Sequence, residues 1–147
     1  TTQSLRQTAE AKSVSLNLNI PGISIETDPG LLDTIVRNLV ANAIKFSYSG
    51  QTVSVAAHVE NNFVTVSVSD TGTGMSGETL DNLFQLDKAK SLPGTANETG
   101  TGLGLFLSHE FAVRLGGKIE VSSKENEGSV FSIVLPLKEE NEDNIGN

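Results

Sequence analysis

The sequence contains no cysteine and no tryptophan, and it has few basic residues, with 10 Lys and Arg against 18 Asp and Glu. Without cysteine the chain can form neither disulfides nor thiolate metal sites, which is typical of a reducing cytoplasm. A net charge of −8 provides no basic surface for phosphate backbones, so we expect no nucleic-acid partner. No apolar run approaches the roughly 18 residues of a membrane span, so we expect no direct membrane contact.

The chain does contain enough apolar sequence for one compact domain. Its 147 residues are 37% hydrophobic, which is sufficient for a single core. We expect one domain over residues 13–137, and we expect the isolated domain to be a monomer. Residues 1–12 are polar and are interpreted as a linker stub from a preceding domain. Residues 138–147 are acidic and predicted to form a disordered tail.

Periodicity predicts an α+β fold. Alternating apolar and polar residues predict three pairs of strands, at residues 16–25, 53–68 and 118–135. The second pair turns at Asn61-Asn62. Helices are predicted at residues 29–46, 78–86 and 103–115, the first with Asp28 as its N-cap. This order predicts a two-layer α/β sandwich, in which a mixed, mostly antiparallel sheet carries three helices on one face.

The first long helix is predicted to have a polar face. Asn38, Asn42 and Lys45 fall within about 60° of one another on a helix. The apolar residues on the opposed side are Leu32, Val36, Leu39, Val40 and Ala43. Such a stripe is often only a solvated face. However, an amide oxygen can coordinate Mg²⁺ and a lysine can bind phosphate, so the set also suits a metal-bound nucleotide.

A carboxylate ends one of the predicted apolar rows. Asp70 follows Val64, Val66 and Val68 on one face of a strand, because side chains repeat every second residue. Burial of this carboxylate is costly unless strong hydrogen bonds or a ligand supply donors. The alternative is an ordinary Asp-Gly turn at a strand end. The next residues, 71–74, include two glycines that permit close backbone approach to whatever Asp70 binds.

A second glycine-rich segment, residues 100–105, stands directly before a predicted helix. Its backbone N–H groups and the positive end of the helix could face a phosphate. The alternative is a flexible hinge of small residues. The irregular stretch that precedes it, residues 87–99, has the length of a functional loop, which favours a nucleotide lid.

Taken in order, these segments resemble the catalytic, ATP-binding domain of sensor histidine kinases. That family has the Bergerat-type ATP-binding fold shared with gyrase, heat-shock chaperone and mismatch-repair ATPases. The resemblance covers residues 16–137. The matching segments are residues 38–47 (asparagine box), 70–75 (first glycine box), 83–84 (phenylalanine box), 93–105 (lid and second glycine box), 115–119 and 128–131.

The resemblance implies a role for each matching residue. Asn42 would coordinate Mg²⁺, Lys45 would contact phosphate, and Asp70 would accept a hydrogen bond from the adenine amino group. Asn38 lies where related ATPases polarise the attacking water, and an amide is a weak base, which suits transfer to a side chain better than hydrolysis. The other implied nucleotide-binding residues are Gly72 and Gly74 near the base, Phe84 at the start of the lid, and Gly100, Thr101, Gly102, Leu103 and Gly104 over the triphosphate.

The resemblance also implies the activity and the partners. It implies a protein-histidine kinase catalytic domain that uses Mg²⁺ and ATP and donates the γ-phosphoryl group to a histidine on a separate dimerisation domain. A response regulator would be served indirectly, and the location would be cytoplasmic, including as part of a membrane-anchored sensor. The chain has no suitable acceptor. His58 lies on a polar strand face, and His109 lies on a helix after the second glycine box. We therefore expect no self-phosphorylation.

Two other functions fit parts of the sequence. Residues 72–77 satisfy the G-x-G-x-x-G pattern of dinucleotide-binding folds between a predicted strand and a predicted helix. That alternative needs a further parallel strand ending in an acidic residue about twenty positions on, where this chain has the predicted loop. The second alternative is an ATP-binding regulatory module without transfer activity.

Overall fold

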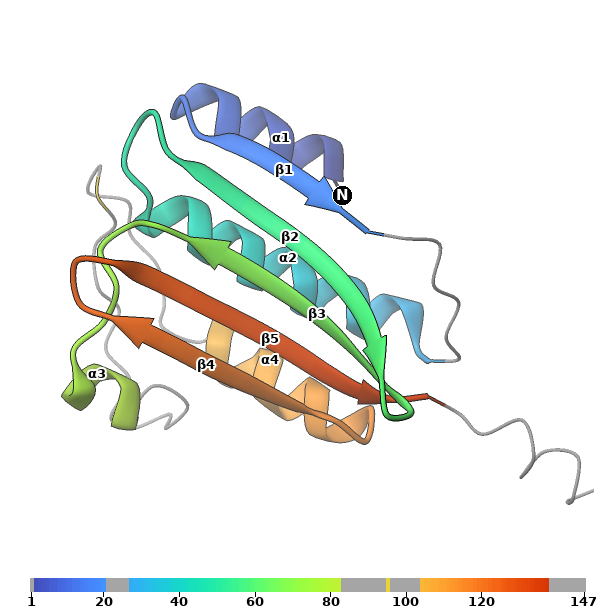
Figure 1. Cartoon of the computed structure of the whole chain (residues 1–147). Helices are drawn as coiled ribbons and strands as arrows, with labels where there is room; N and C mark the ends of the chain where they lie inside the picture. The colour runs from blue at the N-terminus through green and yellow to red at the C-terminus, as the bar shows by residue number, and fades with distance from the viewer. Residues whose placement is uncertain (1, 21–26, 83–94, 96–103, 138–147) are drawn as a thin grey trace, which may run out of the picture.

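A computed structural model describes residues 2–20, 27–82, 95 and 104–137. Its elements follow one another along the chain as helices and strands arranged in two layers (Figure 1). In order they are α1 (Thr2–Ala11), β1 (Ser15–Asn19), α2 (Pro29–Phe46), β2 (Thr52–Glu60), β3 (Phe63–Asp70), α3 (Gly77–Asn82), α4 (Gly104–Arg114), β4 (Lys118–Lys124) and β5 (Gly128–Pro136).

The five strands form one mixed sheet in the order β1-β2-β3-β5-β4. The β1–β2 pair is parallel, and the other three pairs are antiparallel. The predicted mixed, mostly antiparallel sheet is therefore confirmed. β1 pairs with β2, with Leu16 opposite Val53, a distant partner that the expected local pair at residues 16–25 did not include. The second half of that expected hairpin, at Ile23 and Ile25, lies outside the described residues.

The helix α2 begins where its capping residues predict. The Asp28 carboxylate accepts hydrogen bonds from the N–H groups of Gly30 (2.9 Å) and Leu31 (3.1 Å), and Pro29 occupies the first turn. These contacts satisfy N–H groups that have no partner within the helix. The face of α2 that is buried against the sheet consists of Ile35, Leu39, Val40, Ala43 and Ile44.

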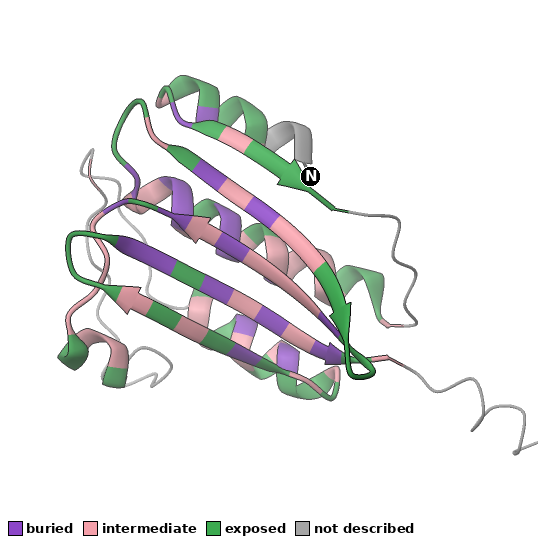
Figure 2. Ribbon diagram, viewed as in Figure 1, coloured by how far each residue is buried: buried purple, intermediate pink, exposed green. Residues whose placement is uncertain are grey.

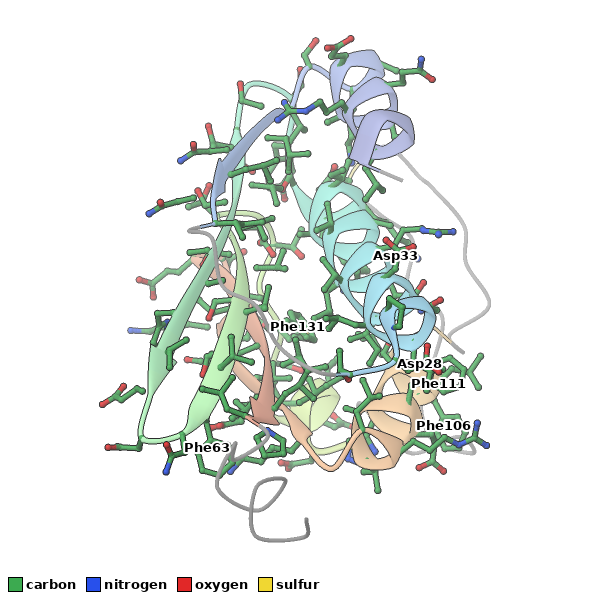
Figure 3. All side chains as sticks on the ribbon, turned by 90° about the vertical axis from the view of Figure 1, so that its right-hand side faces the viewer. Asp28, Asp33, Phe63, Phe106, Phe111 and Phe131 are labelled. Carbon is green, nitrogen blue, oxygen red and sulfur yellow. The ribbon has the colours of Figure 1, made fainter. Side chains whose placement is uncertain are left out.

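The core lies between the sheet and the helices α1, α2 and α4. Seen edge-on, the sheet stands on one side and these helices on the other, with Phe131 of β5 between them (Figure 3). Buried positions alternate with less buried ones along β2, β3 and β5 (Figure 2), as expected for strands with one face in the core. The opposite face carries small polar side chains such as Ser67 and Ser132, whose hydroxyls are 2.9 Å apart.

The turn between β2 and β3 has the geometry that its sequence predicts. Asn61 and Asn62 both have positive φ angles, of 52° and 66°, and they link Glu60 directly to Phe63 across the hairpin. Asparagine tolerates this left-handed region better than most residues, and the twist of such a two-residue turn matches that of the paired strands. The predicted hairpin at residues 53–68 is confirmed.

Residues 2–12, expected to be a linker stub, form helix α1 followed by a turn, and this segment contacts the core. Ala9 is 1% exposed, and Leu5 packs against the buried cluster. The three helices that cover the sheet are thus α1, α2 and α4, whereas α3 lies beyond one end of the sheet (Figure 1). The boundaries of the domain itself remain a prediction.

Candidate functional site

The polar face of α2 contacts the beginning of α4. Asn38, Asn42 and Lys45 are all half-buried. The side-chain amide nitrogen of Asn38 donates to the hydroxyl of Ser108 at 3.1 Å and lies 3.5 Å from the carbonyl oxygen of Gly104. Since Gly104 is the first residue of α4, this contact brings the start of α4 to the polar face of α2. The stripe is therefore more than a solvated helix face.

Asp70 is buried at the end of β3, as the alternation of the valines predicts. Its exposed fraction is 8%, and its Oδ1 atom accepts a hydrogen bond from the N–H of Gly72 at 2.9 Å. Burial raises the pKa of Asp70 above its ordinary value, while hydrogen bonds from the backbone of Gly72 and Ser129 act in the opposite direction. A carboxylate can accept about four hydrogen bonds, so Asp70 has capacity for a further donor.

The turn after Asp70 lies directly on the C-terminal end of α2. A Cβ atom added at Gly72 would lie 1.9 Å from the carbonyl oxygen of Phe46, and the N–H of Thr73 donates to that same oxygen at 3.1 Å. Gly74 has a φ angle of 63°, and a Cβ atom there would lie 2.0 Å from the carbonyl oxygen of Lys124. Gly72 therefore allows the turn to touch α2, which places Asp70 next to the last turn of that helix, and Gly74 allows it to touch the end of β4.

Lys45 occupies that last turn. Its ammonium lies 5.1 Å from the centroid of the Phe46 ring, within the range of a cation–π contact. Its carbonyl oxygen accepts the N–H of Thr95 at 3.1 Å. The polar face of α2 therefore extends from Asn38, at the start of α4, past Asn42 to Lys45, near the turn that follows Asp70.

Two serines that no sequence motif assigned to the site lie near Asp70 in the sheet. Ser129 of β5 lies opposite Asp70 in the sheet and Ser123 of β4 lies opposite Ser129. The two hydroxyls are 2.7 Å apart, and the Ser123 hydroxyl also accepts the N–H of Met75 at 2.9 Å. Both serines occupy inward positions of their strands, so the same alternation that placed Asp70 could have found them once the strand pairing was known.

Part of the predicted site lies outside the described residues. The residues concerned are Phe84, Gly100, Thr101, Gly102 and Leu103. The two histidines are described, His58 in β2 and His109 in α4. Within the described ranges there is no group of three or more His, Cys, Asp or Glu side chains that could hold a metal ion. In that part of the chain, no helix has both the length and the apolar character needed to cross a membrane.

The strand that precedes the G-x-G-x-x-G pattern contradicts the dinucleotide-binding alternative. That fingerprint joins a strand of a parallel sheet to a crossover helix. Here β3 is antiparallel to both of its neighbours, β2 and β5. The first two glycines of the pattern instead bring backbone segments into contact, Gly72 with Phe46 and Gly74 with Lys124.

Comparisons with known proteins agree with this geometry. Residues 27–139 match the family described as histidine kinase-, DNA gyrase B- and HSP90-like ATPase. The chain is 37% identical over 131 residues to the adaptive-response sensory kinase SasA of Prochlorococcus marinus, an alignment that covers 86% of this chain and 34% of SasA. It is 37% identical over 134 residues to the sensor histidine kinase GacS of Pseudomonas protegens, covering 88% of this chain and 15% of GacS.

Solved structures show the same fold. The mycobacterial sensor histidine kinase MprB has a TM-score of 0.77 at 22% identity, covering 93% of this chain and 91% of that one. The catalytic domain of histidine kinase ThkA has a TM-score of 0.75 at 22% identity, covering 92% and 89%. Full-length ShkA in complex with AMPPNP has a TM-score of 0.70 at 27% identity, covering 90% of this chain and 29% of that one.

Fold and family together define an ATP-binding domain with a two-layer α+β architecture. The chain belongs to the histidine kinase-, DNA gyrase B- and HSP90-like ATPase family, and the sensor histidine kinase GacS is among the relatives that it matches. It spans about a third of the length of SasA and less of GacS, so it corresponds to one portion of these longer relatives.

The contact between Gly72 and α2 can be tested by adding one methyl group. Gly72→Ala would force a Cβ atom against a backbone oxygen, so we expect a loss of about 3 kcal/mol in the free energy of unfolding, at the upper end of overpacking costs. Gly77→Ala is the matched control, since nothing lies within 4 Å of the added atom. Urea denaturation followed by circular dichroism measures both. Equal stabilities of the two variants would contradict the contact.

The burial of Asp70 predicts a pH dependence. Its folded-state pKa is raised, so its contribution to stability is full below the unfolded value of 3.8 and is lost as the pH rises through the folded-state pKa. Asp70→Asn does not ionise. We therefore expect the wild type to lose stability relative to Asp70→Asn as the pH rises from 3.5, which is ~0.3 below the unfolded value, to neutrality. The quantity compared is the difference in free energy of unfolding between variant and wild type, measured without nucleotide. The exposed Glu120→Gln is the control, and a difference that stays constant with pH would contradict the burial effect.

Proposed function

We propose that this domain binds Mg²⁺-ATP between the polar face of α2, the end of β3 and the start of α4, and that it donates the γ-phosphoryl group to a histidine on a separate dimerisation domain. The observation that supports this most directly is the placement of Asp70. A buried carboxylate lies beside the last turn of α2, where Lys45 is found, while Asn38 of the same helix contacts the start of α4.

We assign the purine end of the nucleotide to Asp70. Its carboxylate is held by the N–H of Gly72, and burial removes competing water, which strengthens any further hydrogen bond. The adenine amino group offers such a donor. Gly72 and Gly74 have no side chain of their own to obstruct the base at this turn.

The phosphate end is assigned to Lys45 and to the start of α4. Lys45 supplies a positive charge in the last turn of α2. The first N–H groups of α4 have no partner within that helix and lie where the helix dipole favours an anion. The proposed contacts of Gly100, Thr101, Gly102, Leu103 and Gly104 with the triphosphate, and of Phe84 with the lid, rest on the resemblance of those segments to the family.

Mg²⁺ is assigned to Asn42. An amide oxygen is a neutral, hard ligand that can occupy one position of an octahedral ion, while phosphates and waters fill the others. Asn42 fits this role because it lies between Asn38 and Lys45 on the polar face of α2 and is half-buried. The ion would neutralise charge on the phosphates.

In the proposed reaction, a bond forms between an imidazole nitrogen and the γ-phosphorus, the bond to the β,γ-bridging oxygen breaks, and ADP leaves. The imidazole releases its proton to solvent. Asn38 would orient the reacting groups without acting as a base, because an amide accepts protons poorly. The dimerisation domain is thus the direct partner, a response regulator is served indirectly, and we propose a cytoplasmic location.

Replacing the Asp70 carboxylate tests the purine assignment. We expect Asp70→Asn to weaken binding of Mg²⁺-ADP by about 1 to 3 kcal/mol, the scale of a hydrogen bond to a charged group. Isothermal calorimetry measures the affinity, with Glu120→Gln as the control for charge. Wild-type protein should also be stabilised by Mg²⁺-ADP and not by NAD. Unchanged affinity in Asp70→Asn would remove the assigned role of Asp70.

Transfer activity is tested by mixing. The chain is mixed with γ-labelled ATP and a separately prepared, histidine-bearing dimerisation domain from the same full-length protein. We expect the dimerisation domain to become labelled, whereas the chain alone should stay unlabelled. We expect Asn42→Ala to reduce the transfer rate about 100-fold or more, as for the loss of a group that holds charge in the transition state. Nucleotide binding without transfer from an intact acceptor would instead support a regulatory ATP-binding module.

A further inference from the structure

The C-terminal end of α2 is capped in an unusual way. The last four carbonyl groups of a helix lack partners within it, and many helices satisfy them with a left-handed residue, usually glycine. Here the capping residue Ser47 is extended, with φ −86° and ψ 152°. Its hydroxyl donates to the carbonyl of Ala43 at 2.7 Å. The N–H of Ser47 donates to the carbonyl of Ile44 at 3.2 Å, and the carbonyls from Ile44 onward also accept hydrogen bonds from distant segments.

Lys12, which follows α1, provides the charged part of this cap. Its ammonium lies 3.0 Å from the carbonyl oxygen of Ile44 and 2.8 Å from that of Lys45. The side chain is partly buried, and its positive charge faces the negative end of the helix dipole. Hydrogen bonds from charged donors are stronger than neutral ones, so this contact holds the last turn of α2 firmly.

The same end of α2 also accepts hydrogen bonds from Thr73 and Thr95. The carbonyl of Lys45 accepts the N–H of Thr95 as well as the Lys12 ammonium, and the carbonyl of Phe46 accepts the N–H of Thr73. The Thr95 hydroxyl donates to the carbonyl of Ser47. One turn of helix is therefore bound by α1's end, by the turn after Asp70 and by Thr95.

We infer that Lys12 is a positioning residue for nucleotide binding, which acts by fixing the backbone of Lys45. The Lys12 ammonium orients the turn that carries the Lys45 side chain and sets its position relative to the Asp70 turn. Loss of the ammonium leaves two carbonyls without their charged donor and allows the turn to fray, so that Lys45 no longer points reliably at the phosphates. This inference rests on the proposed role of Lys45.

A double-mutant cycle tests this action through Lys45. The variants are Lys12→Met, Lys45→Met and the double variant of the 147-residue chain, and the readout is the Kd of Mg²⁺-ADP well below every unfolding midpoint. We expect Lys12→Met to weaken binding about tenfold, the scale of one charged hydrogen bond, and to have less than about a twofold effect when Lys45 is already Met. A role limited to stability would leave the Kd unchanged in both backgrounds, and an effect on binding that does not pass through Lys45 would be equal in both.

Two controls accompany the cycle. Lys12→Arg keeps a cation and several donors, so we expect it to restore affinity to within about threefold of wild type. Lys118→Met removes a lysine that is exposed on β4 and paired with Glu120 at 3.7 Å, and it should leave the Kd unchanged. If Lys12→Met does not fold, Lys12→Gln takes its place in the cycle.

The outcomes separate the inference from the proposed function. If Lys45→Met alone leaves the Kd unchanged, both the phosphate-binding role of Lys45 and the inference fail. If Lys45→Met weakens binding but Lys12→Met does not, or if the two effects simply add, the proposed function stands and the positioning role of Lys12 is overturned.

Discussion

The contact between the turn after Asp70 and the end of α2 sets the geometry of the site. Gly72 meets the carbonyl of Phe46 so closely that no side chain fits between them, and Thr73 donates a hydrogen bond to the same carbonyl. Because two backbones touch, the distance between β3 and α2 has little freedom. This contact therefore fixes the position of Asp70 relative to that of Lys45, because the two residues lie on either side of it.

Asp70, which we propose to bind the purine, opposes the stability of the fold at neutral pH. Burial raises the pKa of its carboxyl and disfavours the charged form at neutral pH. The hydrogen bonds from Gly72 and Ser129 offset part of that cost, and the hydroxyls of Ser123 and Ser129 lie close by. A ligand that brings its own donor would offset more of it, so the burial that weakens the fold without ligand would favour the proposed contact with the adenine amino group.

Helix α1 has more to do with the site than its polar sequence suggests. Through Ala9 it joins the core, and Lys12, the residue after it, binds the turn of α2 that carries Lys45. The chain spans only part of its longer relatives. The inferred role of Lys12 connects residues 2–12 with the proposed nucleotide site.

Local patterns in the sequence were sufficient for much of the fold and part of the site. The cap at Asp28, the turn at Asn61-Asn62 and the inward direction of Asp70 follow from rules that act over a few residues. The family resemblance rested on segments such as residues 38–47, which are also local. Strand alternation could not show that β1 pairs in parallel with β2, because pairing depends on the whole chain.

By itself, therefore, the sequence determined helices α2 and α4, the strand pairs β2–β3 and β4–β5, and the residue types that suit a nucleotide. Only the tertiary structure decided which distant groups meet: Asn38 with Ser108, Asp70 with Ser129, and Lys45 with Lys12. The physical reason is that these contacts join segments far apart in the chain. Their geometry arises from core packing between helices and sheet, which no local periodicity encodes.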